Sequence, residues 1–492
     1  MHWTFLFTLQ SSVFANHQQV VDNEVIPRVG IIGSGAAGSS VAYFLKKQYP
    51  NVNIEIFERS NRIGGRAYAI PLNLTTCSPQ CENKFINVEM GGSIFAKSNQ
   101  HMMNSIIEFK LELNQPEQMD QESQFGIWNG TLWNFYEKQS RLGKWFNSLK
   151  LLWKYGFLNG PIQAGKISKE IATKFNQIYS FLDDRLTWTN SNDMINHLGL
   201  EDQVTQTCKH YMLSKGINEQ FIDDMLGGIT RNIYLTDVDM IHSFGCQIGM
   251  FASVDEVYSV VGGNHKVFEN MLKDSTISLD TTVISITKQH SSYLVEVESD
   301  GSKKSIEFDH VVLAAPLTDS KIEFVGFDSS QFPIHPVTYV KLYGNSFHTL
   351  IPVTLVYGQL DPTYFALSKV SEIPMNILTP KGASPFNCMA IKAKLNATHT
   401  LVKFFSTAPL TDSDLDSIHV SRIQTWTHSW DLPGSYPLLT PLPVNEWELS
   451  NYLDGLWYAN SFERWVSTME TETIAGRNIA IRLAESFSSK TI

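Results

Sequence analysis

The sequence predicts an α/β protein whose first domain is built on a parallel sheet. Three observations lead to this prediction: an apolar run that breaks into closely spaced glycines at residues 29–40, a helix-patterned segment directly after it, and a second apolar run that ends at Glu58. A strand, a glycine turn, a helix and a second strand in this order form the unit that binds dinucleotides. At 492 residues the chain has room for about three domains.

Residues 28–32 are apolar and β-branched, so we expect a buried strand there. In the turn that follows, the first glycine permits the tight bend, the second lets a phosphate approach the backbone, and the third lets the helix pack on the strand. The helix N-terminus offers free N–H groups to that phosphate. Glu58, 20 residues after Gly38, is placed to accept hydrogen bonds from a ribose. The turn residues expected to bind the cofactor are Gly33, Ser34, Gly35, Ala36, Ala37 and Gly38.

A second glycine turn, Gly64-Gly65-Arg66, follows the acid by six to eight residues. This spacing resembles the glutathione-reductase-like FAD class and, within it, the amine-oxidase and desaturase-like flavoproteins. The resemblance implies a Rossmann-like FAD-binding domain in which Arg59, Gly65 and Arg66 lie beside the cofactor. A surface salt bridge is the alternative role for Arg66.

Three further segments are assigned to the same domain. Residues 85–96 contain a turn that such flavoproteins bring close to the flavin edge. Residues 275–317 are a run of strands, and one position in it corresponds to the place where this class of flavoprotein contacts adenine through a backbone amide. Residues 456–459 read as a strand, and a long helix is expected from near Val466, with its N-terminus toward the cofactor. The expected contacts from these segments are Gly91, Gly92, Ser93, Val283, Ser467, Thr468 and Met469.

The FAD-binding domain must therefore be discontinuous, because the last segment returns to a cofactor held by the first. We expect it to comprise residues 26–100, 255–325 and 450–490. The remainder, 101–254 and 326–449, is expected to form an α+β substrate domain. Its first part has apolar residues every three or four positions, which is typical of helices, and its second part is richer in short β-like runs.

Composition and short sequence signals argue against one class of partner and indicate the cellular route of the protein. The formal net charge is −11 and no basic run exceeds a Lys-Lys pair, which argues against a nucleic-acid partner. Residues 1–15 read as a secretory signal peptide, and no other segment approaches the roughly 20 apolar residues of a membrane span. Acceptor sequences for N-glycosylation at Asn73, Asn129 and Asn396 fit that route.

Cysteine positions predict no structural metal, because no spacing resembles a zinc site. Cys77 and Cys81 stand four apart in a proline-containing loop, where a local disulfide would fit. Cys208, Cys246 and Cys388 are scattered among apolar residues and are expected to be buried thiols. No cysteine lies near the terminal cofactor segment, so the FAD is expected to be non-covalent.

Taken together, the motifs resemble the prenylcysteine oxidase (prenylcysteine lyase) family, from about residue 26 to the C-terminus. Most of this narrower likeness lies in FGIWNG at 125–130 and VVGGN at 260–264, beside the helical insert. The resemblance implies cleavage of the thioether of farnesyl- or geranylgeranyl-cysteine with FAD, O2 and water. The implied products are cysteine, a prenyl aldehyde and H2O2, and the implied setting is the lysosome or secretion, with peripheral lipid association allowed.

The substrate site is the least defined part of this reading. An apolar slot would hold the prenyl chain, with ordinary core as the alternative role for each aromatic considered. Lys341 stands near the place where amine oxidases hold a water beside flavin N5, and a solvated face is its alternative. The rival functions are a flavin amine or polyamine oxidase and a non-catalytic FAD-containing carrier of prenyl lipids. The aromatic candidates for the slot are Trp128, Trp133, Phe135 and Trp153.

Overall fold

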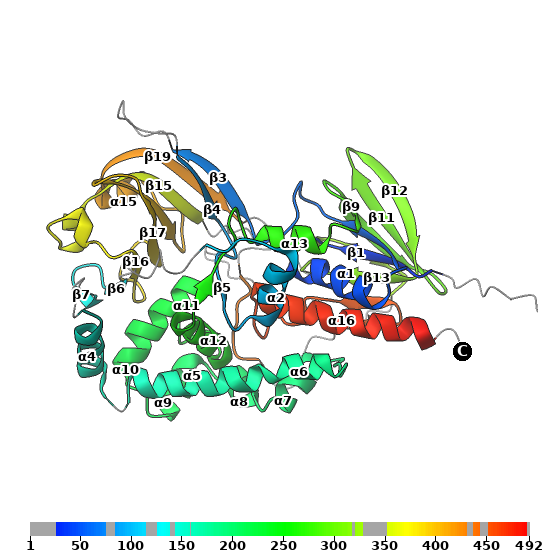
Figure 1. Ribbon diagram of the computed structural model, residues 1–492, viewed down its shortest axis with the longest axis horizontal. Coiled ribbons are helices and arrows are strands. Elements are labelled where there is room, and N and C mark those ends of the chain that lie inside the picture. Colours follow the sequence, from blue (N-terminus) through cyan, green and yellow to red (C-terminus); the bar gives the residue numbers. More distant parts are fainter. Residues whose placement is uncertain are drawn as a thin grey trace, which may run out of the picture.

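The computed structural model describes residues 26–74, 84–114, 125–137, 143–157, 159–316, 320–327, 352–430, 436–442 and 451–489. The proposed signal peptide, Cys77, Cys81 and Lys341 lie outside these residues. Figure 1 shows two sheet-containing regions above a layer of helices, with the helix nearest the C-terminus lying beside the first helix of the chain.

The first region is built on a six-stranded sheet that is parallel except at one edge. Its central strand β1 has the bounds that the sequence predicts, and the predicted strand at 456–459 is β21 with one residue fewer. In spatial order the strands are β20 (Asn451–Leu453), β21 (Leu456–Tyr458), β13 (His310–Leu313), β1 (Arg28–Ile32), β2 (Asn53–Phe57) and β9 (Thr276–Ser278).

Each face of this sheet is covered by a different layer. Val29 and Ile31 of β1 pack with helices α1 (Ala36–Gln48) and α16 (Met469–Ser489). Ile32 packs instead with a four-stranded sheet on the other face. That sheet consists of β12 (Ser302–Phe308), β11 (Tyr293–Ser299), β10 (Thr282–Lys288) and β14 (Glu323–Val325).

Helices α1 and α16 approach so closely that a side chain has no room at Gly476. A Cβ atom there would lie 2.7 Å from Ser40 Cβ and 2.8 Å from the carbonyl oxygen of Ala37. Helix α16 starts at Met469 rather than near Val466, because Thr471 and Thr468 form the helix cap and Thr471 Oγ1 donates to the Val466 carbonyl oxygen. The two helix N-termini therefore lie near each other.

The second region is a seven-stranded sheet that faces the first. Its strands in order are β19 (His419–Ser429), β15 (Pro352–Leu360), β18 (His399–Phe405), β17 (Cys388–Lys394), β16 (Asn376–Leu378), β6 (Phe125–Trp128) and β7 (Trp133–Tyr136). The hairpin of β3 (Ala69–Leu74) and β4 (Lys84–Glu89) packs on this sheet through Leu72 and Val88, which contact the cluster of Val353 and Leu355. One short helix, α15 (Asp412–Ile418), precedes β19.

A helical layer lies below both sheets, and it confirms the helical reading of the chain after residue 140. It comprises α4 (Gly143–Tyr155), α5 (Pro161–Phe175), α6 (Gln177–Asp183), α7 (Ser191–His197), α8 (Glu201–Thr205), α9 (Cys208–Ser214), α10 (Glu219–Phe221), the π-helical turn η1 (Ile222–Leu226), α11 (Gly227–Ile233) and α12 (Ser243–Val254). The remaining elements are α2 (Gln100–Phe109), α13 (His265–Met271), β5 (Phe95–Ala96), β8 (Val257–Tyr258), and the turns η2 (Pro362–Phe365) and η3 (Val370–Glu372). Across the described residues, every helix is too short or too polar to cross a bilayer.

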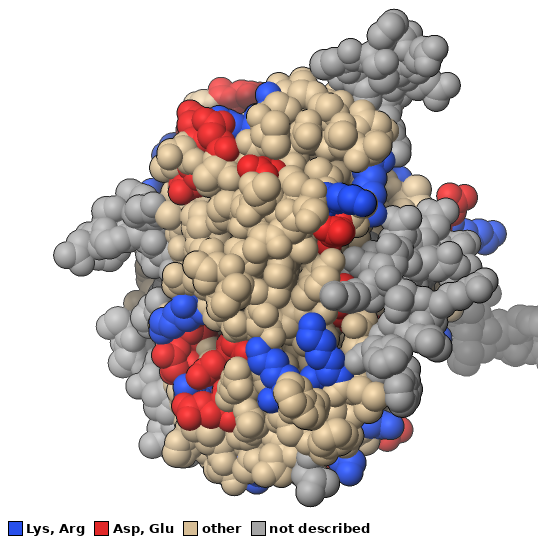
Figure 2. Space-filling view, turned by 90° about the vertical axis from the view of Figure 1, so that its left-hand side faces the viewer, with Lys and Arg blue, Asp and Glu red and all other residues tan. Residues whose placement is uncertain are grey.

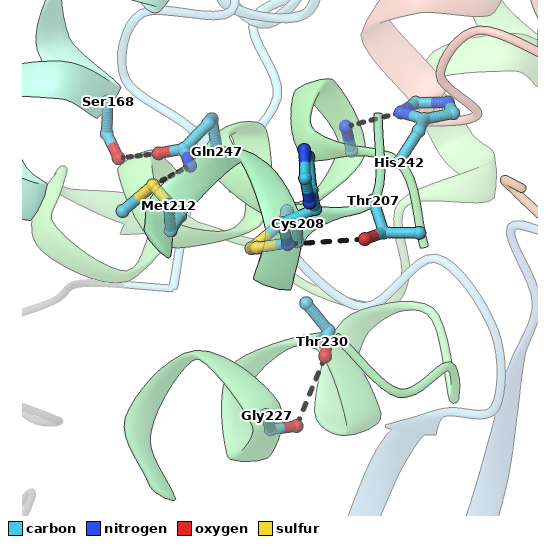
Figure 3. Close-up of a disulfide and its surroundings, with 11 residues drawn as sticks. Ser168, Thr207, Cys208, Met212, Gly227, Thr230, His242 and Gln247 are labelled. Carbon is cyan, nitrogen blue, oxygen red and sulfur yellow. Dashed lines mark hydrogen bonds between the residues drawn. A yellow bond between two sulfur atoms is a disulfide. The ribbon is translucent and has the colours of Figure 1, made fainter. Parts of the chain in front are cut away.

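The expectation that Cys208 and Cys246 are thiols is wrong, because the two are joined in a disulfide (Figure 3). Helices α9 and α12 begin side by side: the Cys208 N–H donates to the Ile241 carbonyl oxygen at 2.8 Å, and Thr207 pairs with His242. This pairing brings together two residues 38 apart in sequence. Cys388 is a buried free thiol, as predicted.

One outer face carries charges of both signs in mixed groups around a broad uncharged area (Figure 2). Charges of opposite sign are paired at several places among the described residues: Arg422 contacts Asp412 and Asp416, and Lys209 contacts Glu219 and Asp223. No large basic surface appears on the face shown there.

Replacing Gly476 with alanine should separate α1 from α16 and lower the free energy of unfolding by about 1–3 kcal/mol, because the added methyl group overpacks the contact. Gly165 of α5 provides the matched control, since a Cβ there meets no atom within 4 Å. Gly165→Ala should leave the protein unchanged or stabilise it by up to about 1 kcal/mol. Urea unfolding of both variants measures the difference, and equal effects would contradict the close contact.

Candidate functional site

A cavity of about 320 Å³ lies where the carboxyl ends of β1 and β2 meet the N-termini of α1 and α16. Its walls come from every segment that the sequence assigned to the cofactor, although these segments are spread over more than 400 residues. Of the predicted site residues, those lining the cavity are Gly33, Gly35, Ala36, Ala37, Glu58, Arg59, Gly65, Arg66, Gly91, Gly92, Val283, Ser467, Thr468 and Met469.

Three predicted residues lie just behind the wall. Ser34 donates to Glu58, the third glycine, Gly38, packs against the Gly33 carbonyl oxygen, and Ser93 donates to the Gly91 carbonyl oxygen at 2.8 Å. The structure therefore gives them supporting contacts rather than a place in the lining. Lys341 lies outside the described residues, so its predicted role stays a prediction.

The two glycine turns touch each other through their backbones. The Gly64 N–H donates to the Ser34 carbonyl oxygen at 3.0 Å, and a Cβ on Gly65 would lie 3.1 Å from Gly35 Cα. Gly65 has φ +56° and Gly33 has φ +105°, conformations that favour glycine. The contact leaves a backbone-lined cradle into which a phosphate can come close.

Glu58 ties these turns together. One carboxylate oxygen accepts hydrogen bonds from the backbone N–H and the hydroxyl of Ser34, both at 2.9 Å. The other accepts from the N–H and hydroxyl of Ser60, at 2.9 and 2.8 Å. The acid at the end of β2 is therefore held in one orientation at the cavity wall.

Arg66 extends from the second turn to Glu463, with which it forms an ion pair. Glu463 follows β21 and is fully buried. Glu472, in the first turn of α16, also lines the cavity and is 6% exposed, yet neither of its carboxylate oxygens has a hydrogen-bond partner. Burial and the nearby Glu463 raise the pKa of Glu472 well above its ordinary value.

The Gly91-Gly92 turn forms another wall and rests on the backbone of the second glycine turn. The Gly92 N–H donates to the Arg66 carbonyl oxygen at 2.9 Å, and Gly91 leaves no room for a Cβ against that same oxygen. Its other side is held by Lys403 of β18, whose ammonium donates to the Glu89 carbonyl oxygen and to Ser93 Oγ. Lys403 is 2% exposed, and burial lowers its pKa to about 7.

The seven-stranded sheet closes the cavity on the side away from the phosphate cradle. Phe405 lies at the end of β18, two residues after Lys403, and Trp430 and Tyr436 complete this aromatic wall. Arg62 lies over the ring of Tyr68, 4.0 Å from its centroid, beside Trp430. The wall is thus largely aromatic, and Arg62 also lines the cavity.

None of the four aromatic residues proposed for a substrate slot lines this cavity. Trp128 and Phe135 are 1% exposed and belong to core clusters, which was the alternative reading. Trp133 is partly buried against Trp128 and donates to the Phe365 carbonyl oxygen. Trp153 is wrong as a lining residue, because it lies on the outer side of α4 and is 82% exposed.

The chain fits an FAD at this position on three grounds. The glycine cradle has no room for side chains, two long helices begin at the cavity, and a buried carboxyl group there lacks hydrogen-bond partners. The backbone of the cradle and the N-termini of α1 and α16 would hold the diphosphate, Glu58 a ribose, and the Gly91-Gly92 turn the flavin ring. This arrangement suits a dinucleotide with an isoalloxazine ring facing the aromatic wall.

Several functional residues escaped the sequence analysis. Lys403 stands between apolar residues in TLVKFF, and this unusual position for a lysine was a usable signal. Glu472 had no comparable signal, since acidic residues are common in the first turn of a helix. Phe405, Trp430 and Tyr436 become neighbours of the cavity only through the packing of the second sheet.

Glu58→Ala should weaken FAD binding by about 10- to 100-fold, because it removes the carboxylate that orients the first glycine turn and Ser60, which precedes the second turn. Glu55→Ala, on the same strand but away from the cavity, is the control and should bind FAD normally. The ratio of flavin to protein absorbance after gel filtration measures the effect. Equal flavin content in both variants would contradict the role of Glu58.

The lowered pKa of Lys403 predicts how the free energy of unfolding depends on pH. Between about pH 7 and pH 10.5 the unfolded chain holds a proton that native Lys403 has released, so Lys403 makes stability rise with pH in this window. Lys403→Met should lose that contribution, whereas Lys394→Met, which changes an exposed lysine on β17, should keep it. Urea unfolding across the window tests this, and parallel profiles for the wild type and Lys403→Met would overturn it.

Comparison with known proteins agrees with the geometry. The family model of prenylcysteine lyase matches residues 138–492, and that of an NAD(P)-binding Rossmann-like domain matches residues 31–108. A farnesylcysteine lyase of Arabidopsis thaliana is 27% identical over 489 residues, which cover 96% of this chain and 90% of the relative. Prenylcysteine oxidase 1 of Bos taurus is 27% identical over 485 residues, covering 92% of this chain and 87% of the relative.

Solved structures show the same fold at low sequence identity. Cyclohexylamine oxidase from Brevibacterium oxydans matches with a TM-score of 0.56 at 13% identity, covering 94% of this chain and 100% of that one. A fatty acid isomerase from P. acnes matches with a TM-score of 0.59 at 11% identity, covering 93% and 98%. The family match covers well over half of the residues and includes the wall formed by α16 and the second sheet. The chain is therefore an FAD-type oxidoreductase that belongs to the prenylcysteine lyase family.

Proposed function

We propose that this protein is an oxidase that cleaves the thioether of farnesyl- or geranylgeranyl-cysteine. In the balanced reaction, the thioether, O2 and water give cysteine, the prenyl aldehyde and H2O2. The relatives named above support the substrate class. The observation that carries the proposal is the cavity itself, in which a dinucleotide cradle opens onto an aromatic wall.

A bound flavin supplies the two-electron oxidation of the carbon between sulfur and alkene, with O2 as the final acceptor. The protein holds the reacting parts in place and keeps bulk water out. Lys403 fixes the Gly91-Gly92 turn from behind through the Glu89 carbonyl oxygen and Ser93 Oγ. Phe405, Trp430 and Tyr436 provide apolar surface against which the prenyl end can pack.

Burial of the prenyl chain supplies most of the binding free energy in this proposal. At about 0.8 kcal/mol per buried carbon group, a fifteen-carbon chain contributes on the order of 10 kcal/mol before the cost of ordering it. An apolar wall rather than an array of hydrogen bonds is what such a ligand requires. The non-covalent FAD predicted from the sequence agrees with this proposal, because the described free thiol, Cys388, is 4% exposed and does not line the cavity.

The main rival, oxidation of an amine or polyamine, needs acidic groups that receive a cationic substrate. The sheet that closes the cavity instead brings lysines near the flavin turn: Lys403 donates to the Glu89 carbonyl oxygen and to Ser93 Oγ, and the charge of Lys392 on β17 is close enough to lower the pKa of Lys403. Glu89 is the nearby acid, and burial raises its pKa to about 7. This charge pattern favours a neutral thioether over a polyamine.

We also propose that the protein follows the secretory route to the lysosome or the outside of the cell, where it meets prenyl lipids. The glycosylation acceptors support this, because Asn396 is exposed in a turn and Asn73 is exposed on β3. Trp153, Phe157 and Ile162 are 82%, 54% and 48% exposed around the end of α4, and this apolar surface supports peripheral lipid association.

The test is anaerobic mixing of the flavin-loaded protein with farnesylcysteine, geranylgeranylcysteine or spermine. The prenylcysteines should bleach the flavin absorbance, and O2 should then restore it with one peroxide and one free thiol per turnover. A cysteine thioether with a saturated chain is the matched control and should not react, because it lacks the alkene beside the oxidised carbon. Bleaching by spermine alone would establish the rival, and tight prenylcysteine binding without bleaching would establish a carrier.

A further inference from the structure

Glu472 is a buried carboxyl group in the wall of the cofactor cavity, and its surroundings disfavour a negative charge. It lies in the first turn of α16, lines the cavity and is 6% exposed. Neither of its oxygens has a hydrogen-bond partner in the described structure. An ionised carboxylate in this condition would lose the hydration of its charge without gaining a hydrogen bond.

Arg66 offsets this charge only in part, because it is already paired with Glu463 and its attraction is a smaller cause than burial and the charge of Glu463. If all three groups were ionised, the cluster would carry one net negative charge inside the protein. The other charged or titratable groups of the cavity wall are Glu58, Arg59, Arg62 and Tyr436, and none of them has a hydrogen bond or an ion pair with Glu472 among the described contacts. Burial is the larger cause that raises the pKa of Glu472, and the charge of Glu463 adds to it.

A dinucleotide brings further negative charge into the same cavity through its diphosphate. An ionised Glu472 would repel that charge in a poorly hydrated space, where electrostatic interactions are strong. A protonated Glu472 would not repel it, and its O–H would be a further hydrogen-bond donor at the cavity wall.

We propose that Glu472 is a protonated carboxylic acid in the flavin-loaded protein at neutral pH, and that its ionisation releases the flavin. At a pH at which Glu472 of the empty cavity is ionised, FAD therefore binds together with one proton. The proton comes from solvent and returns to it when the flavin leaves. This inference concerns the cofactor site alone and holds whichever substrate the enzyme oxidises.

The experiment measures flavin release from the loaded protein. Serial dilution at each pH between 6 and 9 gives the dissociation constant from the recovered fluorescence of free flavin. Once Glu472 ionises, the wild-type constant should rise by up to about tenfold per pH unit, the slope set by one linked proton. Glu472→Gln, which is isosteric and uncharged, should bind as tightly as the wild type at pH 6 and should lose much less affinity than the wild type between pH 6 and pH 9.

Two controls separate this role from other titrations. Glu485→Gln changes an exposed acid on the same helix and should follow the wild-type profile. Glu89 and Lys403 also titrate near pH 7 behind the Gly91-Gly92 turn, and their contribution should persist in Glu472→Gln. A wild-type affinity that does not change with pH, or a Glu472→Gln variant with the wild-type slope, would overturn the proposal.

A second measurement serves if Glu472→Gln does not fold. The infrared spectrum of the wild-type holoenzyme at pH 7.5 should contain the carbonyl band of a buried protonated carboxyl group, shifted in heavy water. Glu470 also has a raised pKa, about 6, and is ionised at that pH, whereas Glu89, with a pKa of about 7, is partly protonated, so the same spectrum of Glu89→Gln identifies the part of the band that does not come from Glu89. Absence of the band would show that Glu472 is charged beside the bound flavin and would refute the inference.

Discussion

The contact between helices α1 and α16 is the constraint on which the rest of the structure depends. Gly476 lets the backbone of the last helix lie against Ser40 and Ala37 of the first. This contact brings two helix N-termini to one cavity and places Glu463 within reach of Arg66. Without it the glycine turns would still form, but only half of the cofactor site would exist.

Burial shifts the pKa values of both basic and acidic side chains around this site. Burial outweighs the opposite charge near each group, Glu89 for Lys403 and Arg66 for Glu472, so it favours the neutral form of both. Arg66 keeps its charge beside Glu463. The result is a cavity with a polar, backbone-lined end for phosphates and a weakly charged, aromatic end for an oily ligand.

Local sequence signals predicted the parts of the fold that depend on neighbouring residues. The strand at 28–32 and the glycine turn after it were predicted correctly, because apolar β-branched residues and closely spaced glycines act within a few positions. The seven-stranded sheet was seen only as scattered β-like runs. Its order depends on pairing β6 with β16, which lie about 250 residues apart in the chain.

The same distinction explains what was missed at the site. Lys403 is buried because β18 lies between β15 and β17, and nothing in the neighbouring residues specifies that central position. Cys208 and Cys246 pair because α9 and α12 begin side by side. This contact belongs to the tertiary structure and cannot be deduced from the spacing of the two cysteines in the sequence. Trp153 was assigned to a slot by its residue type, but its helix turns it outward.

Glu470 at the start of α16 accepts hydrogen bonds from the backbone of His101 and Met102 at the start of α2, and from the hydroxyl of Tyr179 on α6. Three helices are thus joined by one buried carboxyl group, whose partners lie hundreds of residues earlier in the sequence. The apolar face of α1 that packs on α16 therefore stays uncovered until residues 469–489 have been synthesised.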